Sequence, residues 1–145
     1  MADKRKSIVD FLETKFKTIA IPTYNTDAGD NVFVWKSTAY EAAEMPALNI
    51  RDVKDTVLDE LAATVGIWTH NLDLEIDFIA NTIAMARSVI VDVTKALGVD
   101  TTCGGNAVMI TMKENEIHTE QEDKIVAGGV IRFTILYRTN RFSET

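Results

Sequence analysis

The sequence predicts an α+β fold: a mixed, mainly antiparallel sheet with two main helices packed on one face and a long hairpin near the C-terminus. Apolar residues recur at helical spacing in 3–19 and 81–97, and they alternate with polar residues along 67–78. Two further strand-like segments close the chain. The order of elements does not repeat a strand–helix–strand unit, which favours helices segregated to one face of the sheet.

The first helix is expected from Asp3 to about Ile19, where apolar residues are separated by Lys and Glu. Asp3 or Ser7 can cap its start because both side chains accept a hydrogen bond from a first-turn N–H. Pro22 is expected to end it, since the residue before a proline avoids helical backbone angles.

The segment that follows is predicted as turns and short strands. Residues 23–31 are polar and turn-rich, 32–36 form a short strand, and 37–45 are irregular with room for one helical turn. Pro46 opens a second strand over 46–52, because the first residue of a strand needs no ladder donor. Residues 53–66 fit either a short helix or a loop.

The strongest strand signal covers 67–78, where apolar and polar residues alternate without a break. One face carries Trp68, His70, Leu72, Leu74, Ile76 and Phe78, and the other carries Thr69, Asn71, Asp73, Glu75 and Asp77. Such a strand would span roughly 40 Å. This length suggests that part of it pairs with, or lies against, another chain.

The second helix is expected to run to about Leu97, with Asn81 or Thr82 as its cap and Gly98 just past its end. It is apolar nearly all round, which predicts that it is covered on more than one side. Its narrow polar face consists of Arg87, Ser88, Asp92 and Lys95.

The C-terminal part predicts a hairpin. Residues 99–106 read as a loop, 107–112 as a strand, 113–124 as a long, mobile acidic tip and 125–138 as the final strand. Gly128 and Gly129 indicate a bulge or a close backbone approach.

Composition limits the function classes. The 145 residues suit one domain, 1–145, and the net charge of −7 argues against binding a phosphate backbone. A single cysteine, Cys103, predicts a reducing, cytoplasmic folding site. No apolar run is long enough for a membrane span, and no signal peptide is expected. The sequence contains no P-loop, dinucleotide fingerprint, HExxH or CxxC, so we expect neither an enzyme nor a cofactor.

Three carboxylates, Asp73, Glu75 and Asp77, project from one face of the long strand. They fit three interpretations: a divalent-metal site, the solvated face of an amphipathic strand, or a lining that repels DNA. Arg132 and Arg138 lie on the wet face of the last strand. If the two strands are neighbours, cross-strand ion pairs follow.

Other polar residues favour structural roles. His70 is expected to be a hydrogen-bonded core or interface histidine, and Cys103 a loop thiol rather than a nucleophile. His118 is expected on the solvated surface. The acidic run from Glu114 to Asp123 fits either a solvated loop or an arm that docks on a basic surface of another protein.

In its arrangement the chain resembles the tail-terminator family of long-tailed bacteriophages, small proteins that cap the tail tube and join it to the neck. Five segments carry the resemblance: IVDFLETKF, AEMPALNI, WTHNLDLEIDF, TIAMARSVIVDVTKALG and GGVIRFTILYRT. The segment 52–66 is longer than we expect for the family.

The resemblance implies a homohexameric ring in the virion tail or neck, assembled in the host cytoplasm. Its partners would be the tail tube protein, a neck or head-completion protein and, as an optional partner, the sheath protein. DNA would pass through the pore without specific binding. On this interpretation Asp73, Glu75, Asp77, Arg132 and Arg138 are candidate pore-lining residues. Candidate subunit or tube contacts are Trp35, Glu116, His118, Glu120, Glu122 and Asp123.

Three alternatives remain open. The first is another neck or tail-completion protein. The second is a small metal-dependent hydrolase that uses Asp73, Glu75 and Asp77. The third is a monomeric adaptor that forms no ring.

Overall fold

The computed structural model describes residues 3–58, 66–121 and 125–140. These residues form the predicted α+β fold, with a five-stranded sheet in the order β1-β2-β3-β5-β4. β1 runs parallel to β2, and every other neighbouring pair is antiparallel. The elements are α1 (Lys4–Phe16), β1 (Val32–Val34), β2 (Ala47–Val57), β3 (Ile67–Ala80), α2 (Ile83–Val99), β4 (Met109–Gln121) and β5 (Ile125–Asn140).

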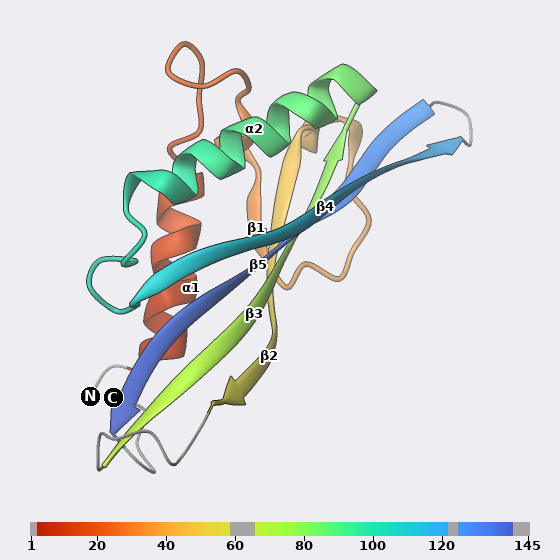
Figure 1. The fold of residues 1–145 in the computed structure, drawn as a ribbon. Coiled ribbons are helices and arrows are strands. Elements are labelled where there is room, and N and C mark those ends of the chain that lie inside the picture. The colour runs from red at the N-terminus through yellow and green to blue at the C-terminus, as the bar shows by residue number, and fades with distance from the viewer. Residues whose placement is uncertain (1–2, 59–65, 122–124, 141–145) are drawn as a thin grey trace.

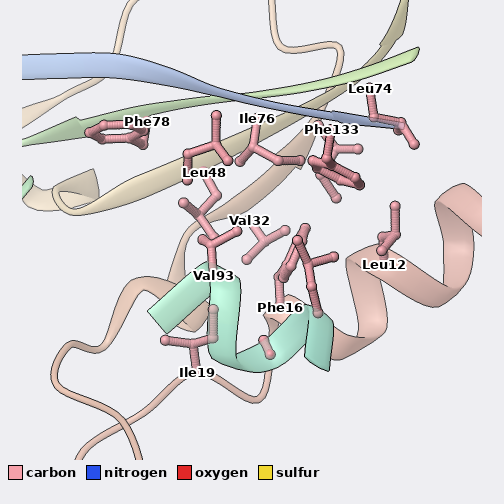
Figure 2. Packing of buried hydrophobic residues seen from close by; sticks show 14 of the residues in the cluster. Leu12, Phe16, Ile19, Val32, Leu48, Leu74, Ile76, Phe78, Val93 and Phe133 are labelled. Atoms are coloured by element: carbon pink, nitrogen blue, oxygen red, sulfur yellow. The ribbon is translucent and has the colours of Figure 1, made fainter. Parts of the chain in front are cut away.

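Both helices pack on the same face of the sheet, as predicted, and leave the other face open (Figure 1). The core lies between the two helices and the sheet, where Phe16 of α1 and Val93 of α2 face Leu48, Ile76 and Phe133 of the strands (Figure 2). Each large apolar side chain buried in this way contributes about 1.5–3 kcal/mol to folding. No helix in the described part of the chain is long and apolar enough to cross a membrane.

Helix α1 begins at the predicted cap, because the Asp3 carboxylate accepts a hydrogen bond from the N–H of Lys6. The prediction that Pro22 ends the helix is wrong, since α1 already ends at Phe16. There the N–H of Ile19 donates to the Phe16 carbonyl at 3.0 Å, which tightens the chain into a turn. The fully buried Ile19 lies in this turn and packs in the core.

Helix α2 is capped by Thr82, whose hydroxyl accepts from the N–H of Met85 at 3.1 Å. Gly98 lies inside this helix rather than after it, which corrects the predicted end. The chain turns instead at Asp100, whose carboxylate accepts from the N–H groups of Thr102 and Gly104. The helix packs on both the sheet and α1, as its apolar character predicts, although Val91 stays 55% exposed.

Asp92 was assigned to the polar face of α2, and the structure corrects this assignment because Asp92 is fully buried. Its carboxylate accepts three hydrogen bonds from the loop after α1: from the N–H of Asn25 at 3.0 Å, and from the N–H and hydroxyl of Thr26 at 2.8 and 2.7 Å. Asp92 therefore fastens that loop to the helix.

Strand β3 has the predicted alternation and extends to Ala80. Its whole length pairs with β5, and the stretch from His70 to Ile79 also pairs with β2. Both edges of β3 from His70 to Ile79 are therefore occupied within the chain, which contradicts pairing with another chain there, and contact of its open face with another chain stays a prediction. Strand β2 continues to Val57, so residues 53–57 are neither helix nor loop. Residues 59–65 of that segment lie outside the described residues.

The C-terminal hairpin is present, but the prediction of an acidic tip over 113–124 is wrong for residues 113–121, which continue strand β4; residues 122–124 lie outside the described residues. β4 is an edge strand, so its polar side chains can remain in solvent on both faces. Of the two alternatives for the glycines, the close approach is correct. A Cβ on Gly129 would lie 1.9 Å from the Glu116 carbonyl oxygen, and the β4–β5 register has no shift there.

Candidate functional site

The open face of the sheet carries a row of charges that alternate in sign across four strands. Arg51 of β2 lies opposite Glu75 of β3, Glu75 opposite Arg132 of β5, and Arg132 opposite Glu114 of β4. Register places these side chains on one face because successive residues of a strand point to opposite sides. The row is the centre of the candidate site.

Each neighbouring pair in this row is an ion pair. Arg51 Nη2 donates to Glu75 Oε2 at 2.6 Å, and Arg132 Nε donates to Glu75 Oε1 at 3.3 Å. Arg132 Nη1 donates to Glu114 at 2.9 Å and to Glu116 at 3.2 Å. The predicted cross-strand pairing of Arg132 is therefore confirmed. Isolated exposed pairs contribute only about 0.2–1 kcal/mol each.

The three acids of β3 lie together on this face, as predicted, but each has a cationic partner. Asp77 pairs with Arg51 Nε at 2.7 Å, and Asp73 lies 3.8 Å from the Lys113 ammonium. The hydrogen bond to Asp77 raises the pKa of Arg51 further, which keeps the guanidinium charged. The sequence analysis overlooked Arg51 and Lys113. Arg51 lies in the predicted strand 46–52, so it could have been considered as a cross-strand partner for the acids of 67–78.

Arg138 stays outside this network. It lies opposite Thr69 at the far end of β5, and no described acid forms an ion pair with it. Its carbonyl oxygen accepts a hydrogen bond from the Lys4 ammonium at 2.7 Å. This bond links the start of α1 to the end of β5 through the Arg138 backbone, and the residue itself is exposed.

A shallow groove of about 350 Å³ runs over the same face. Gly128 and Gly129 contribute no side chains to its lining, which leaves space between the flanking charges. The groove is lined by charged and aromatic residues that include Tyr40, Arg51, Asp77, Glu116, His118 and Arg132. Burial raises the pKa of Tyr40 to about 12, so its hydroxyl stays protonated at neutral pH.

The candidate contact residues are spread over two places. Glu116 and His118 line the groove from β4. Trp35 follows β1, with its ring 51% exposed and its indole N–H donating to Asp52 at 2.7 Å. Glu120 lies in β4 opposite Val126, and its side chain is outside the described part, as are Glu122 and Asp123 altogether.

A metal centre needs carboxylate oxygens that are free to bind the metal, whereas Asp73, Glu75 and Asp77 are each paired with an Arg or Lys side chain. In the described ranges, no group of three His, Cys, Asp or Glu residues lies close enough to hold a metal ion. The oxygens of Glu75 and Asp77 that would have to ligate a metal already accept from arginines. The metal-dependent hydrolase interpretation therefore gains no support from this geometry.

A second polar cluster lies beneath α1, and the sequence analysis did not foresee it. The Asp55 carboxylate accepts from His70 Nδ1 at 2.9 Å and from the Tyr137 hydroxyl. His70 Nε2 lies 2.8 Å from the Thr139 hydroxyl, so the prediction of a hydrogen-bonded histidine is confirmed. Burial, reinforced by the hydrogen bond to Asp55, raises the pKa of Tyr137.

Asp52 connects this cluster to the edge of the sheet. Burial opposes its ionisation, but hydrogen bonds from the Trp35 indole and the Arg5 guanidinium outweigh burial and hold the pKa of Asp52 below its usual value. Arg5 Nε donates to Asp52 Oδ2 at 2.7 Å. The residues of the cluster come from α1, β2, β3 and β5, which no local sequence pattern could have brought together.

Comparisons with known proteins give one line of evidence. No family model matches the chain, and no curated protein matches it in sequence. Among solved structures, it is similar to a chain in the virion of a native gene transfer agent (GTA) particle, with 12% identity and a TM-score of 0.57. The match covers 87% of this chain and 91% of that chain. At this identity the likeness establishes a shared fold.

Proposed function

We propose that this chain is a structural virion protein that forms a hexameric ring on the end of a phage-type tail tube. The ring would stop tube polymerisation and present a docking surface to the neck or head. The observation that carries the proposal is the fold shared with a virion chain over nearly the full length of both chains. The resemblance of the five sequence segments to tail terminators is consistent with it.

The open face is the proposed lining of the pore. The ion-pair network of this face joins Arg51, Arg132 and Lys113 to five carboxylates, those of Asp73, Glu75, Asp77, Glu114 and Glu116, and has a net charge of −2. By register the exposed Lys54 and Arg138 lie on the same face and balance this charge. A surface without an excess of positive charge does not attract the DNA backbone strongly, so DNA could pass without being held. Each cation of the network is already bound by protein carboxylates and is less available to phosphates.

In this role the partners are other copies of the chain, the tail tube protein and a neck or head-completion protein, with the sheath protein as an optional further partner. The place of action is the tail or neck of the virion, after assembly in the host cytoplasm. Trp35, Glu116 and His118 are exposed at two separate places, which suits contacts with two different neighbours.

The first test is negative-stain electron microscopy of the concentrated protein, together with its mass from light scattering. Six-fold rings with a central hole and a mass near six times 16.1 kDa are the expected result. A second arm adds the protein to polymerising tail tube subunits and measures tube length. Tubes that grow to the same length with and without the protein contradict the capping role.

The pore lining has its own test, in which Asp73→Asn, Glu75→Gln and Asp77→Asn are combined. The face then carries an excess of positive charge, so binding of double-stranded DNA should rise and should weaken steeply with salt. A control that neutralises the exposed Asp10 and Asp30 and the half-buried Glu13 changes the net charge equally, away from this face. Equal DNA binding by both triple variants contradicts the pore lining.

A second candidate function is another neck or tail-completion protein. The specific observation that favours it is that the structural likeness is to a chain of a virion, which leaves the position within the particle open. Binding to isolated tail tubes favours the terminator. Binding to head or neck components, with no binding to tubes, favours the alternative.

A further inference from the structure

The sheet has two open edges in the described part of the chain. One is the outer edge of β4, which pairs only with β5. The other is the second half of β2, Val53–Val57, because β1 pairs with β2 only from Leu48 to Ile50. An open edge presents unpaired backbone N–H and C=O groups, which can accept another strand.

Both edges carry exposed aliphatic side chains at the same height of the sheet. On β4, Met109 and Met112 are 49% and 40% exposed. On β2, Val53 and Val57 are 40% and 38% exposed. Register connects the two bands. Met109 lies opposite Leu136 of β5, which lies across β3 from Thr56, and Met112 lies opposite residue 133, which lies across β3 from Asp52, the residue before Val53.

Strand direction makes the two edges compatible. β4 is antiparallel to β5, β5 to β3, and β3 to β2, so β4 and β2 run in opposite directions. If a second copy is placed beside the first in the same orientation, β4 of one meets β2 of the other as an antiparallel pair. Antiparallel pairing is slightly more stable per residue than parallel pairing.

The charges of the edges are also complementary. On the open face, β4 carries the exposed Lys113, Glu114 and Glu116, a net charge of −1, and both glutamates are bound to Arg132 of β5. On the same open face, β2 carries Lys54, which is exposed and forms no ion pair with the described residues. An acidic edge beside an unpaired lysine favours one partner orientation over the other.

We propose that the β4 edge of one copy adds to the Val53–Val57 edge of the next, so that a single sheet continues from copy to copy. The contact is heterologous, which means that each copy uses both edges and the chain of copies closes into a ring if the rotation allows. This inference deepens the proposed function, on which its ring form rests, by naming the surfaces that join the subunits in solution.

The test is cross-linking between two single-site variants, Thr111→Cys on β4 and Thr56→Cys on β2. Both positions are exposed and lie on the open-face side of their strands. The native Cys103 is fully buried and does not compete for the reagent. The two variants are mixed at a concentration at which light scattering reports association, and a short bis-maleimide is added. Thr94→Cys on the exposed side of α2 is the control.

The expected result is a cross-linked dimer in the mixture and none from either variant alone. Met109→Lys and Val57→Lys should each weaken association by about tenfold or more, because each places a charge in an apolar contact. Val91→Lys, on the outside of α2, is the matched control and should leave association unchanged. Circular dichroism checks that all three variants are folded.

Three results overturn the inference: a monomer at millimolar concentration, a dimer from Thr111→Cys alone, or association without the mixed cross-link. If the protein is monomeric, or associates without the mixed cross-link, the capping function still stands provided that six-fold rings appear on tail tubes. Conversely, a mixed cross-link in open filaments that do not bind tail tubes supports the edge contact and contradicts the capping function.

Discussion

Replacing Asp92 with alanine should destabilise the protein strongly, because its buried carboxylate is the acceptor for three donors of one loop. The two donors of Thr26 are buried, while the N–H of Asn25 is partly exposed and can bind water. A buried donor left unpaired costs about 1–3 kcal/mol. Two such donors, together with the lost packing, predict a loss of about 3–5 kcal/mol, a large part of a domain's total stability.

Asp100 provides a matched control. Its carboxylate also accepts three hydrogen bonds, two from Thr102 and one from Gly104, but all three are exposed. Water can replace the acceptor there, so Asp100→Ala should cost about 0.5–2 kcal/mol, as the loss of an exposed cap does. Asp92→Asn keeps one acceptor oxygen, and its loss should lie between those of the two alanine variants.

Urea unfolding, followed by tryptophan fluorescence and by far-ultraviolet circular dichroism, measures these losses. Coincident transitions from the two probes justify a single free energy of unfolding. The melting temperature of Asp92→Ala should fall by about 10 °C, given the usual shift per kcal/mol for a chain of this size. Losses for Asp92→Ala and Asp100→Ala that agree within about 0.5 kcal/mol would refute the reasoning, because burial would then not decide the cost.

Three further predictions concern backbone contact, titration and thiol reactivity. Gly129→Ala should lose about 1–3 kcal/mol, because the new Cβ meets a backbone carbonyl of β4, whereas Gly98→Ala has free space and should be neutral or stabilising; comparing their urea midpoints tests both. The lowered pKa of Asp52 means that its stabilisation is complete above the ordinary carboxyl pKa and is lost as the pH falls through the lowered value. Asp52→Asn should therefore flatten the fall in stability below about pH 4 and leave its slope near neutral pH unchanged, which unfolding at a series of pH values measures. Burial raises the pKa of Cys103 to about 12, so maleimide should label this thiol only after unfolding, and rapid labelling of the native protein would contradict its burial.

The sequence was most informative where a side chain's surroundings are set by its own element. The alternation in β3 predicted both its faces, and Asp3 and Thr82 were correct candidates for the two caps. The Glu75–Arg132 ion pair follows from strand alternation, because β3 and β5 are neighbours in the sheet and these two residues lie opposite each other.

The sequence was least informative where distant partners decide the structure. Nothing local distinguishes Asp92 from a surface acid, because its donors are backbone groups of a loop far along the chain. The acidic segment of β4 was predicted as a loop because an edge strand can be polar on both faces and then has no alternation. Val53–Val57 could not be assigned to a strand without β3 as its template.

The hydrogen bond from the Lys4 ammonium to the Arg138 carbonyl has a practical consequence for imaging. It links the first turn of α1 to the end of β5 at one end of the sheet, whereas β4 ends and β5 begins at the opposite end (Figure 1). A fluorescent or gold label attached at residue 4 or at residue 140 therefore marks the same end of the sheet. Particles labelled at either position would report one orientation, and a label at the start of β5 would report the reverse.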